Sequence, residues 1–141
     1  MSKWIAALIF VVFSSAGVAN NEDTGIKTSD EAVQAAVMWL QKVDGKQLQQ
    51  AYDSSGKLMR DAVTFEKWST AVTGVRDKLG IVQARDLSNV TAHESFPGVP
   101  KGDYMVVVFK TKFAQKPDSK ETLSFQREDD GQYRVIGYFV Q

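Results

Sequence analysis

The sequence contains no cysteine, and this absence excludes two ways of stabilising or anchoring a small protein. Disulfide bonds cannot form, so the folded chain has to be held together by a packed core. A lipoprotein anchor, which is attached to a cysteine, is excluded as well. Hydrophobic residues make up 43% of the chain and aromatic residues 11%, which is sufficient for the core of one ordinary domain.

The sequence has only one histidine, and neither sign of charge is in excess. The 17 Lys and Arg residues balance the 17 Asp and Glu residues, so nothing favours nucleic acid or an anionic membrane surface as a partner. The single histidine, His93, could hold a metal only if carboxylates such as Asp86 and Glu94 converged on it. Its surroundings match no zinc motif. We therefore expect no metal, no cofactor and no nucleic-acid partner.

The chain also lacks an apolar run of about 20 residues, the length that a membrane-spanning helix needs. Instead, Lys3 precedes a short apolar run, and small residues follow it up to Ala19. This order at 1–19 is typical of a secretory signal peptide and predicts cleavage after Ala19. We expect a product exported to the periplasm or secreted, without a membrane anchor after cleavage. It would consist of a mobile N-terminus at 20–27 and a single domain at 28–141.

Hydrophobic residues recur at helical spacing in the first half of this domain. Thr28-Ser29-Asp30-Glu31 fits a capping box at the start of the first helix, and Gly45 is a plausible end. Thr64 is a good N-cap, and Gly80 can adopt the left-handed conformation that ends a helix. The predicted helices lie at 28–45, near 48–52, near 58–63 and at 64–80.

After Gly80 the hydrophobic period changes from that of a helix to the alternation of strands. Residues 96–103 hold two prolines and two glycines and are expected to form a loop, and 114–119 a turn. Asp129-Asp130-Gly131 is a hairpin signal that permits a two-residue or a three-residue loop. Helices before strands indicate an α+β fold, with the N-terminal helices packed on one face of a four-stranded antiparallel meander. The predicted strands lie at 81–92, 104–113, 122–128 and 133–140.

A series of short motifs runs in fixed order from about residue 33 to the C-terminus. The motifs are Trp39-Leu40, Val43-Asp44, Trp68, Val75-Arg76, Leu79-Gly80, Arg85, Pro97-Gly98-Val99-Pro100, Gly102-Asp103-Tyr104, Phe113-Ala114-Gln115-Lys116, Glu121-Thr122, Asp130-Gly131-Gln132-Tyr133-Arg134-Val135 and Gly137-Tyr138-Phe139. In this series the chain resembles the uncharacterised bacterial family DUF4019, with Tyr133 where that family is expected to carry tryptophan. The resemblance implies an exported bacterial protein and no known activity. The order of elements is also similar to cystatin-like and nuclear-transport-factor-2-like folds.

Four polar residues in or beside these motifs are the candidate binding residues: Arg76, Arg85, Lys116 and Glu121. They could form an anion-binding rim or a surface for a partner. In the simpler interpretation, Lys116 pairs with Glu121 across a tight turn and the arginines are ordinary charges at element ends. An exposed pair of that kind contributes about 0–1 kcal/mol. No residue is assigned a catalytic role.

The last feature is the apolar character of both faces of two predicted strands. Val106 and Val108 alternate with Met105 and Val107, and Ile136 and Tyr138 are predicted to share the face opposite Val135. Helices cover only one face, so Val106, Val108, Ile136 and Tyr138 are expected to meet a second copy, a ligand or a partner.

We therefore expect a non-catalytic exported domain that binds an unknown small ligand or envelope protein, with homodimerisation through the sheet as one form of this. A structural envelope protein that self-associates is a further possibility. The alternative function is a small ketosteroid-isomerase-like enzyme. Asp44 or Asp53 would then be a general base in a conical pocket, with Tyr52 or Tyr104 as a hydrogen-bond donor. Both aspartates also fit ordinary turns at helix ends.

Overall fold

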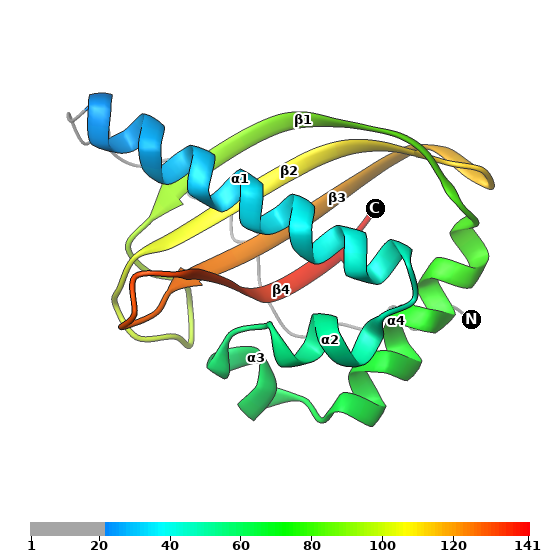
Figure 1. Cartoon of the computed structure of the whole chain (residues 1–141), viewed down its shortest axis with the longest axis horizontal. Helices are drawn as coiled ribbons and strands as arrows, with labels where there is room; N and C mark the ends of the chain where they lie inside the picture. The colour runs from blue at the N-terminus through cyan, green and yellow to red at the C-terminus, as the bar shows by residue number, and fades with distance from the viewer. Residues whose placement is uncertain (1–21) are drawn as a thin grey trace.

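The computed structural model describes residues 22–141, with side chains described from Thr28 onwards, so the predicted signal peptide lies outside the described residues. In this part of the chain, helices precede strands, which confirms the predicted α+β class (Figure 1). None of the described helices is both long enough and apolar enough to cross a membrane. The elements are α1 (Glu22–Asp44), α2 (Leu48–Asp53), α3 (Lys57–Ala62), α4 (Phe65–Leu79), β1 (Val82–His93), β2 (Tyr104–Phe113), β3 (Lys116–Arg127) and β4 (Tyr133–Val140).

The first helix begins earlier than the sequence predicted. α1 starts at Glu22, so the prediction that a capping box on Thr28 starts it is wrong, and Thr28 lies within the helix. Residues 22–27, which were expected to precede the helix, therefore belong to it.

The end of α1 shapes the region that later forms the candidate site. The helix ends at Asp44, just before Gly45, as predicted. The left-handed residue is not Gly45 but Lys46, with φ of 59°. The N–H groups of Lys46 and Gln47 donate to the carbonyls of Val43 and Lys42, in the pattern that commonly closes a helix. This turn fixes the position of the Asp44 side chain at the helix end.

Both predicted ends of α4 are confirmed. The Thr64 hydroxyl accepts a hydrogen bond from the Lys67 N–H at 3.3 Å, as an N-cap does. Gly80 follows the helix with φ of 76°, a conformation that disfavours any other residue.

The four strands form an antiparallel meander in the order β1-β2-β3-β4, as predicted. The predicted turn at 114–119 is too long, because β3 already begins at Lys116 and its residues pair with β2. Between β3 and β4, Gly131 has φ of 82° and donates to the Glu128 carbonyl, and the Glu128 N–H donates to Gln132. This is a type I turn followed by a glycine bulge, so the loop has three residues.

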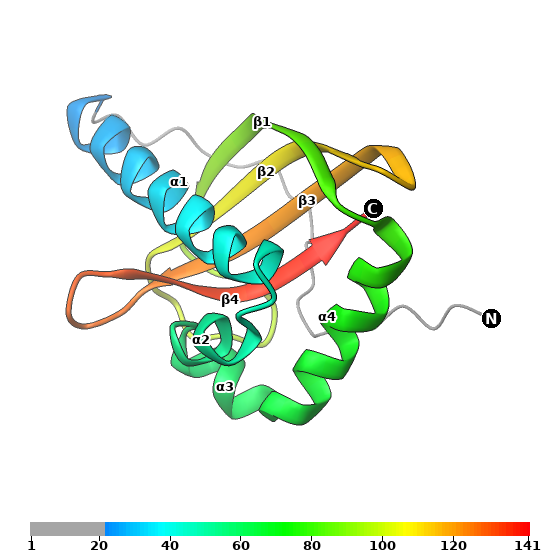
Figure 2. The same ribbon diagram turned by 45° about the vertical axis from the view of Figure 1, so that its right-hand side comes forward.

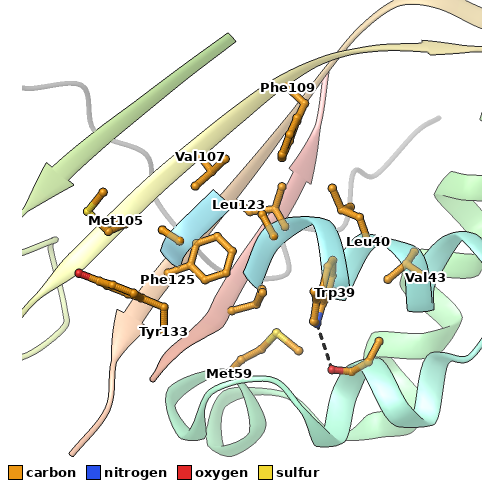
Figure 3. Close-up of a cluster of buried hydrophobic side chains, with 14 of the residues drawn as sticks. Trp39, Leu40, Val43, Met59, Met105, Val107, Phe109, Leu123, Phe125 and Tyr133 are labelled. Carbon is orange, nitrogen blue, oxygen red and sulfur yellow. Dashed lines mark hydrogen bonds between the residues drawn. The ribbon is translucent and has the colours of Figure 1, made fainter. Parts of the chain in front are cut away.

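The main core lies between the helices and one face of the sheet. α1 crosses this face obliquely, and the shorter helices lie beside β4 (Figures 1 and 2). Trp39 and Leu40 from α1 belong to one buried cluster with Leu123 and Phe125 on β3 (Figure 3). The Trp39 indole N–H donates to the Ala51 carbonyl at 3.0 Å, which ties α1 to α2. The interior is therefore filled by side chains along this stretch.

The opposite face of the sheet carries a second, smaller cluster. Val106, Val108 and Ile136 pack with Phe96 from the loop after β1 and with Tyr104. Leu58 and Val99 are partly buried against this cluster. Val106 and Val108 are 5% and 9% exposed, so residues of the chain itself cover much of the surface on which the expectation of a second copy rested. Homodimerisation through this face stays a prediction.

Tyr138 does not share that face, which corrects the predicted grouping. β3 and β4 pair with a shift between Ser124 and Phe125, where Ile136 stands as an extra residue. This bulge reverses the alternation of side chains after it. The Tyr138 ring consequently points to the helices and lies 5.1 Å from the Trp39 ring, while Ile136 stays on the opposite face.

Candidate functional site

Four charged side chains from four separate elements meet at the end of α1 and form what we call the ionic cluster: Asp44, Arg76, Arg85 and Glu121. Arg85 on β1 donates to both carboxylates, at 2.8 and 3.1 Å to Asp44 and at 2.7 and 3.3 Å to Glu121. Arg76 on α4 donates to Asp44 at 2.6 Å. Two arginines and two carboxylates give the cluster a formal charge of zero.

Glu121 is the most deeply buried member, with a side chain that is 0% exposed. Besides Arg85, its carboxylate accepts hydrogen bonds from the Thr111 hydroxyl at 2.5 Å and from the Tyr138 hydroxyl. Strand pairing explains this convergence. Arg85 stands opposite Thr111, and Tyr138 stands opposite Leu123, two residues from Glu121 on the same face. A buried carboxylate with this many donors is fully satisfied.

The electrostatic environment keeps Asp44, Arg76 and Arg85 in their ordinary charge states at neutral pH. Burial alone would raise the pKa of Asp44, but the hydrogen bonds and charges of Arg85 and Arg76 outweigh it and hold this pKa below its usual value. Burial opposes the charge of both arginines, yet their carboxylate partners raise the pKa of each. Burial and the adjacent Glu121 raise the pKa of Tyr138 well above its usual value, so its hydroxyl stays a donor.

A cleft of about 690 Å³ opens beside the cluster, between the end of α1, α4 and the start of β1. Asp44 and Arg76 belong to its wall, together with Lys46 and Asp77. The rest of the wall is largely apolar and includes Val43, Leu48, Val72, Ile81 and Val82. The volume is within the range of small-molecule sites in proteins.

Arg76 has one feature that its ion pair with Asp44 leaves unexplained. Its Nη1 atom is buried and has no hydrogen-bond partner among the described residues. The guanidinium lies over the Phe113 ring, with Cζ 5.1 Å from the ring centroid. The aromatic face offsets part of the cost of burying the charge. An unpaired buried donor of this kind marks a position where a water or ligand oxygen would be favourable.

Three of the four predicted binding residues are thus brought together, and the fourth is not. Arg76, Arg85 and Glu121 belong to the ionic cluster, whereas Lys116 is exposed at the start of β3. The predicted pair between Lys116 and Glu121 is wrong, because Glu121 points into the interior and pairs with Arg85.

Sequence reasoning missed three features of the site. It assigned Asp44 to a different role, and it did not connect Thr111 or Tyr138 with Glu121. The alternation of side chains in β2 and β3 could have placed Thr111 and Glu121 on one face. For Tyr138 no such signal existed, because the bulge at Ile136 changes its face.

The other residues considered for catalysis do not converge. Asp53 accepts from the Gln49 amide at 2.9 Å on an exposed surface. The hydroxyl of Tyr52 donates to the Val63 carbonyl at 2.6 Å, and that of Tyr104 to the Pro100 carbonyl at 2.5 Å. These contacts close turns and connect elements.

His93 has a local role as well. Its Nε2 lies 2.9 Å from the Thr91 hydroxyl, and its ring centroid lies 5.1 Å from that of Phe96. Burial lowers its pKa, which favours the neutral imidazole.

Taken together, the fold and the site define an α+β domain in which helices cover one face of a four-stranded meander and a buried ionic cluster closes one end. The chain belongs to the family DUF4019, described as a protein of unknown function, whose model matches residues 35–138. That range includes every member of the ionic cluster. No curated protein and no solved structure matched the chain.

Proposed function

We propose that the protein is a small exported domain, without catalytic activity of its own, that binds a small polar ligand in the cleft between α1, α4 and β1. The observation that carries this proposal is that Asp44 and Arg76 belong to the ionic cluster and also line the cleft. The ligand would therefore meet charged groups that are already held in place.

This arrangement reduces the cost of binding. Asp44 is fixed by Arg76 and Arg85, so no rotamer freedom has to be lost when a ligand contacts it. The cleft is lined by two carboxylates, Asp44 and Asp77, and by two cations, Lys46 and Arg76. A ligand with both donors and acceptors, uncharged or zwitterionic, fits this lining better than one with a single net charge.

The energetics of buried ion pairs also support a functional role. Replacing such a pair with apolar residues is often neutral or stabilising, so stability alone is a weak reason to keep it. Here the cluster occupies a position that apolar side chains fill elsewhere in the same interface. The presence of the cluster is therefore better explained by what the cleft binds.

Binding is favoured over the alternative, a ketosteroid-isomerase-like enzyme, because neither carboxylate of the cluster suits a general base. Glu121 is fully hydrogen-bonded, and the lowered pKa of Asp44 makes it a poor proton acceptor near neutral pH. The aromatic side chains of the core, among them Trp39, Trp68 and Tyr138, pack edge to face where a conical pocket would lie.

Export is supported by the N-terminal sequence, with Lys3 before a short apolar run and small residues up to Ala19. The protein recovered from the envelope of an exporting cell is expected to begin at Asn20. Measurement of its intact mass checks this, and the mass of the uncleaved chain would contradict it.

Ligand binding can be tested with a variant that blocks the cleft and leaves the cluster intact. Thr73 is exposed and lines the cleft, so Thr73→Trp should fill it. Thr70→Trp, one turn earlier on the exposed surface of α4, is the matched control. The probes are the twenty amino acids and a set of small sugars, each added at millimolar concentration, with the melting temperature as the readout.

We expect at least one probe to raise the melting temperature of the wild type and of Thr70→Trp but not that of Thr73→Trp. A ligand at about 100 times its Kd stabilises the folded state by about 2.7 kcal/mol. If no probe has an effect, or if Thr73→Trp responds as the wild type does, the proposed function is wrong.

A further inference from the structure

A second cavity, of about 300 Å³, lies on the other side of α4 and is distinct from the cleft. It is bounded by α3, the start of α4, the loop after β1 and the middle of β4. Its wall is largely apolar and includes Leu58, Val63, Trp68, Val99 and Ile136, with Tyr138 as a further part. The one charged side chain in the lining, Asp61, pairs with Lys57 and is largely exposed.

The same cavity adjoins a free section of sheet edge. β4 is the last strand of the sheet, and its first half is partly covered, because the Gly56 N–H donates to the Val135 carbonyl at 2.7 Å. This contact needs a glycine, since a Cβ on residue 56 would lie 2.8 Å from Ile136. Beyond Ile136 no described residue continues the pairing.

The direction of the free backbone groups follows from the register. Lys120 and Gln141 exchange two hydrogen bonds of 2.9 Å, so they form a hydrogen-bonded pair. In an antiparallel ladder such pairs alternate with non-hydrogen-bonded ones. Leu123 and Tyr138 are therefore a non-hydrogen-bonded pair, and the N–H and C=O of Tyr138 point away from β3. They have no backbone partner among the described residues.

Tyr138 thus combines two features that face the same space. Tyr138 is part of the wall of the apolar cavity, and its main chain offers one donor and one acceptor at the open edge. An uncharged hydrophobe would fill the cavity but leave these backbone groups unpaired. A strand of a partner would satisfy both, because its main chain pairs with the edge while every second side chain turns toward one face.

We infer that an extended peptide segment of a partner protein adds to β4 at Tyr138 and places an apolar side chain into the cavity beside Trp68. A cavity of this volume accommodates a large side chain such as leucine, methionine or phenylalanine together with the adjoining main chain. The exposed carboxylate of Asp61 at the cavity disfavours an acidic residue at that position. This surface is independent of the proposed ligand cleft, which lies beyond α4.

The experiment uses the mature protein and a phage-displayed library of random nine-residue peptides. Selected peptides are then synthesised, and their binding is measured by calorimetry. We expect apolar residues at alternating positions in the selected sequences. The cavity variant is Ala62→Trp, since Ala62 is exposed and lines the cavity. Its control is Ala92→Trp, an exposed alanine on β1 at the opposite edge of the sheet. Melting temperatures establish that both variants fold.

Ala62→Trp should weaken peptide binding by at least about tenfold, and Ala92→Trp should leave it unchanged. N-methylation of the peptide backbone provides the second criterion. Two peptides are compared, each methylated on one of the two sets of alternate amides. Methylation of the set that faces β4 should abolish binding, and methylation of the other set should be tolerated.

Three outcomes would overturn the inference. The first is that no peptide is selected, or that the selected peptides bind Ala62→Trp as well as they bind the wild type. The second is that N-methylation of either set of alternate amides is tolerated, which would show that the cavity binds side chains without strand pairing. The third is that the wild type sediments as a dimer and Ala62→Trp as a monomer, which would identify a second copy as the occupant.

Discussion

The helix-covered face of the sheet is built in two different ways along its length. At the end near Tyr133, Trp39 and Leu40 belong to one apolar cluster with Leu123 and Phe125, and the Trp39 indole N–H is shared between the Ala51 carbonyl and the Ser55 hydroxyl. At the other end, on the same strands, Glu121 and its partners replace apolar side chains. The first end gains stability in proportion to the apolar area that it buries. The second depends on a complete set of partners, because a buried charge left unpaired is costly.

The two ends should differ in how a substitution changes the free energy of unfolding. An apolar cluster loses about the free energy of the atoms removed plus that of the cavity left behind. When an ionic cluster loses one member, the partners of that member are left buried without a counter-charge. The effects of substitutions within the cluster are therefore not additive. Removing both members of a pair can then be less harmful than removing one.

The largest effect is expected for Trp68→Ala at the apolar end. Trp68 is 1% exposed, and its ring centroid lies 5.9 Å from that of Trp39. Removing a buried aromatic side chain of this size should lower the free energy of unfolding by about 3–5 kcal/mol. Urea denaturation measures this. A loss below about 1 kcal/mol, the size of a surface effect, would show that α4 docks differently.

At the ionic end, Glu121→Leu should lower the free energy of unfolding by about 3 kcal/mol, because Arg85 and Tyr138 lose their shared acceptor. The double variant Glu121→Leu with Arg85→Met should recover much of this loss. Glu94→Leu on an exposed loop is the control and should change stability by less than about 0.5 kcal/mol. Additive losses in the double variant would show that the two residues are not coupled.

The free energy of unfolding at acidic pH should differ between the wild type and the Asp44→Asn variant. The pKa of Asp44 is lowered in the folded state, so its contribution is present above the pKa of the unfolded chain and is lost as the pH falls through the folded value. Between about pH 5 and pH 2 the wild type should therefore lose stability more steeply than Asp44→Asn. Parallel curves would contradict the assigned ion pairs with Arg76 and Arg85.

The smallest effect is expected for Lys116→Ala. Lys116 is exposed beside the β2–β3 turn and takes no part in the ionic cluster. Its removal should change the free energy of unfolding by less than about 0.5 kcal/mol and leave ligand binding unchanged. A loss of binding in this variant would indicate that the ligand binds at the β2–β3 hairpin instead of the cleft.

The order of helices and strands could be predicted because it depends on local periods and turn residues. Thr64 and Gly80 mark the ends of α4 correctly, and Asp129-Asp130-Gly131 marks the last hairpin. The start of α1 could not be predicted from Thr28, because a capping motif also fits inside a helix that begins earlier.

The candidate site was predictable only in part. Arg76, Arg85 and Glu121 stood out as polar residues in otherwise apolar motifs, and the structure joins them. Their partner Asp44 and the position of Tyr138 depend on strand register and on the bulge at Ile136. A bulge is a property of two paired strands, and a single sequence does not reveal which residue is left unpaired.

β4 is the last of the four strands in the order of the sequence, and this affects when folding can finish. This strand supplies Tyr133 and Val135 to the main core, Ile136 to the cluster on the opposite face and Val140 to the cluster beside α4. A chain that emerges N-terminus first lacks a part of every cluster until β4 has emerged. The domain therefore stays incomplete until this strand joins the sheet, and all three clusters close together at that step.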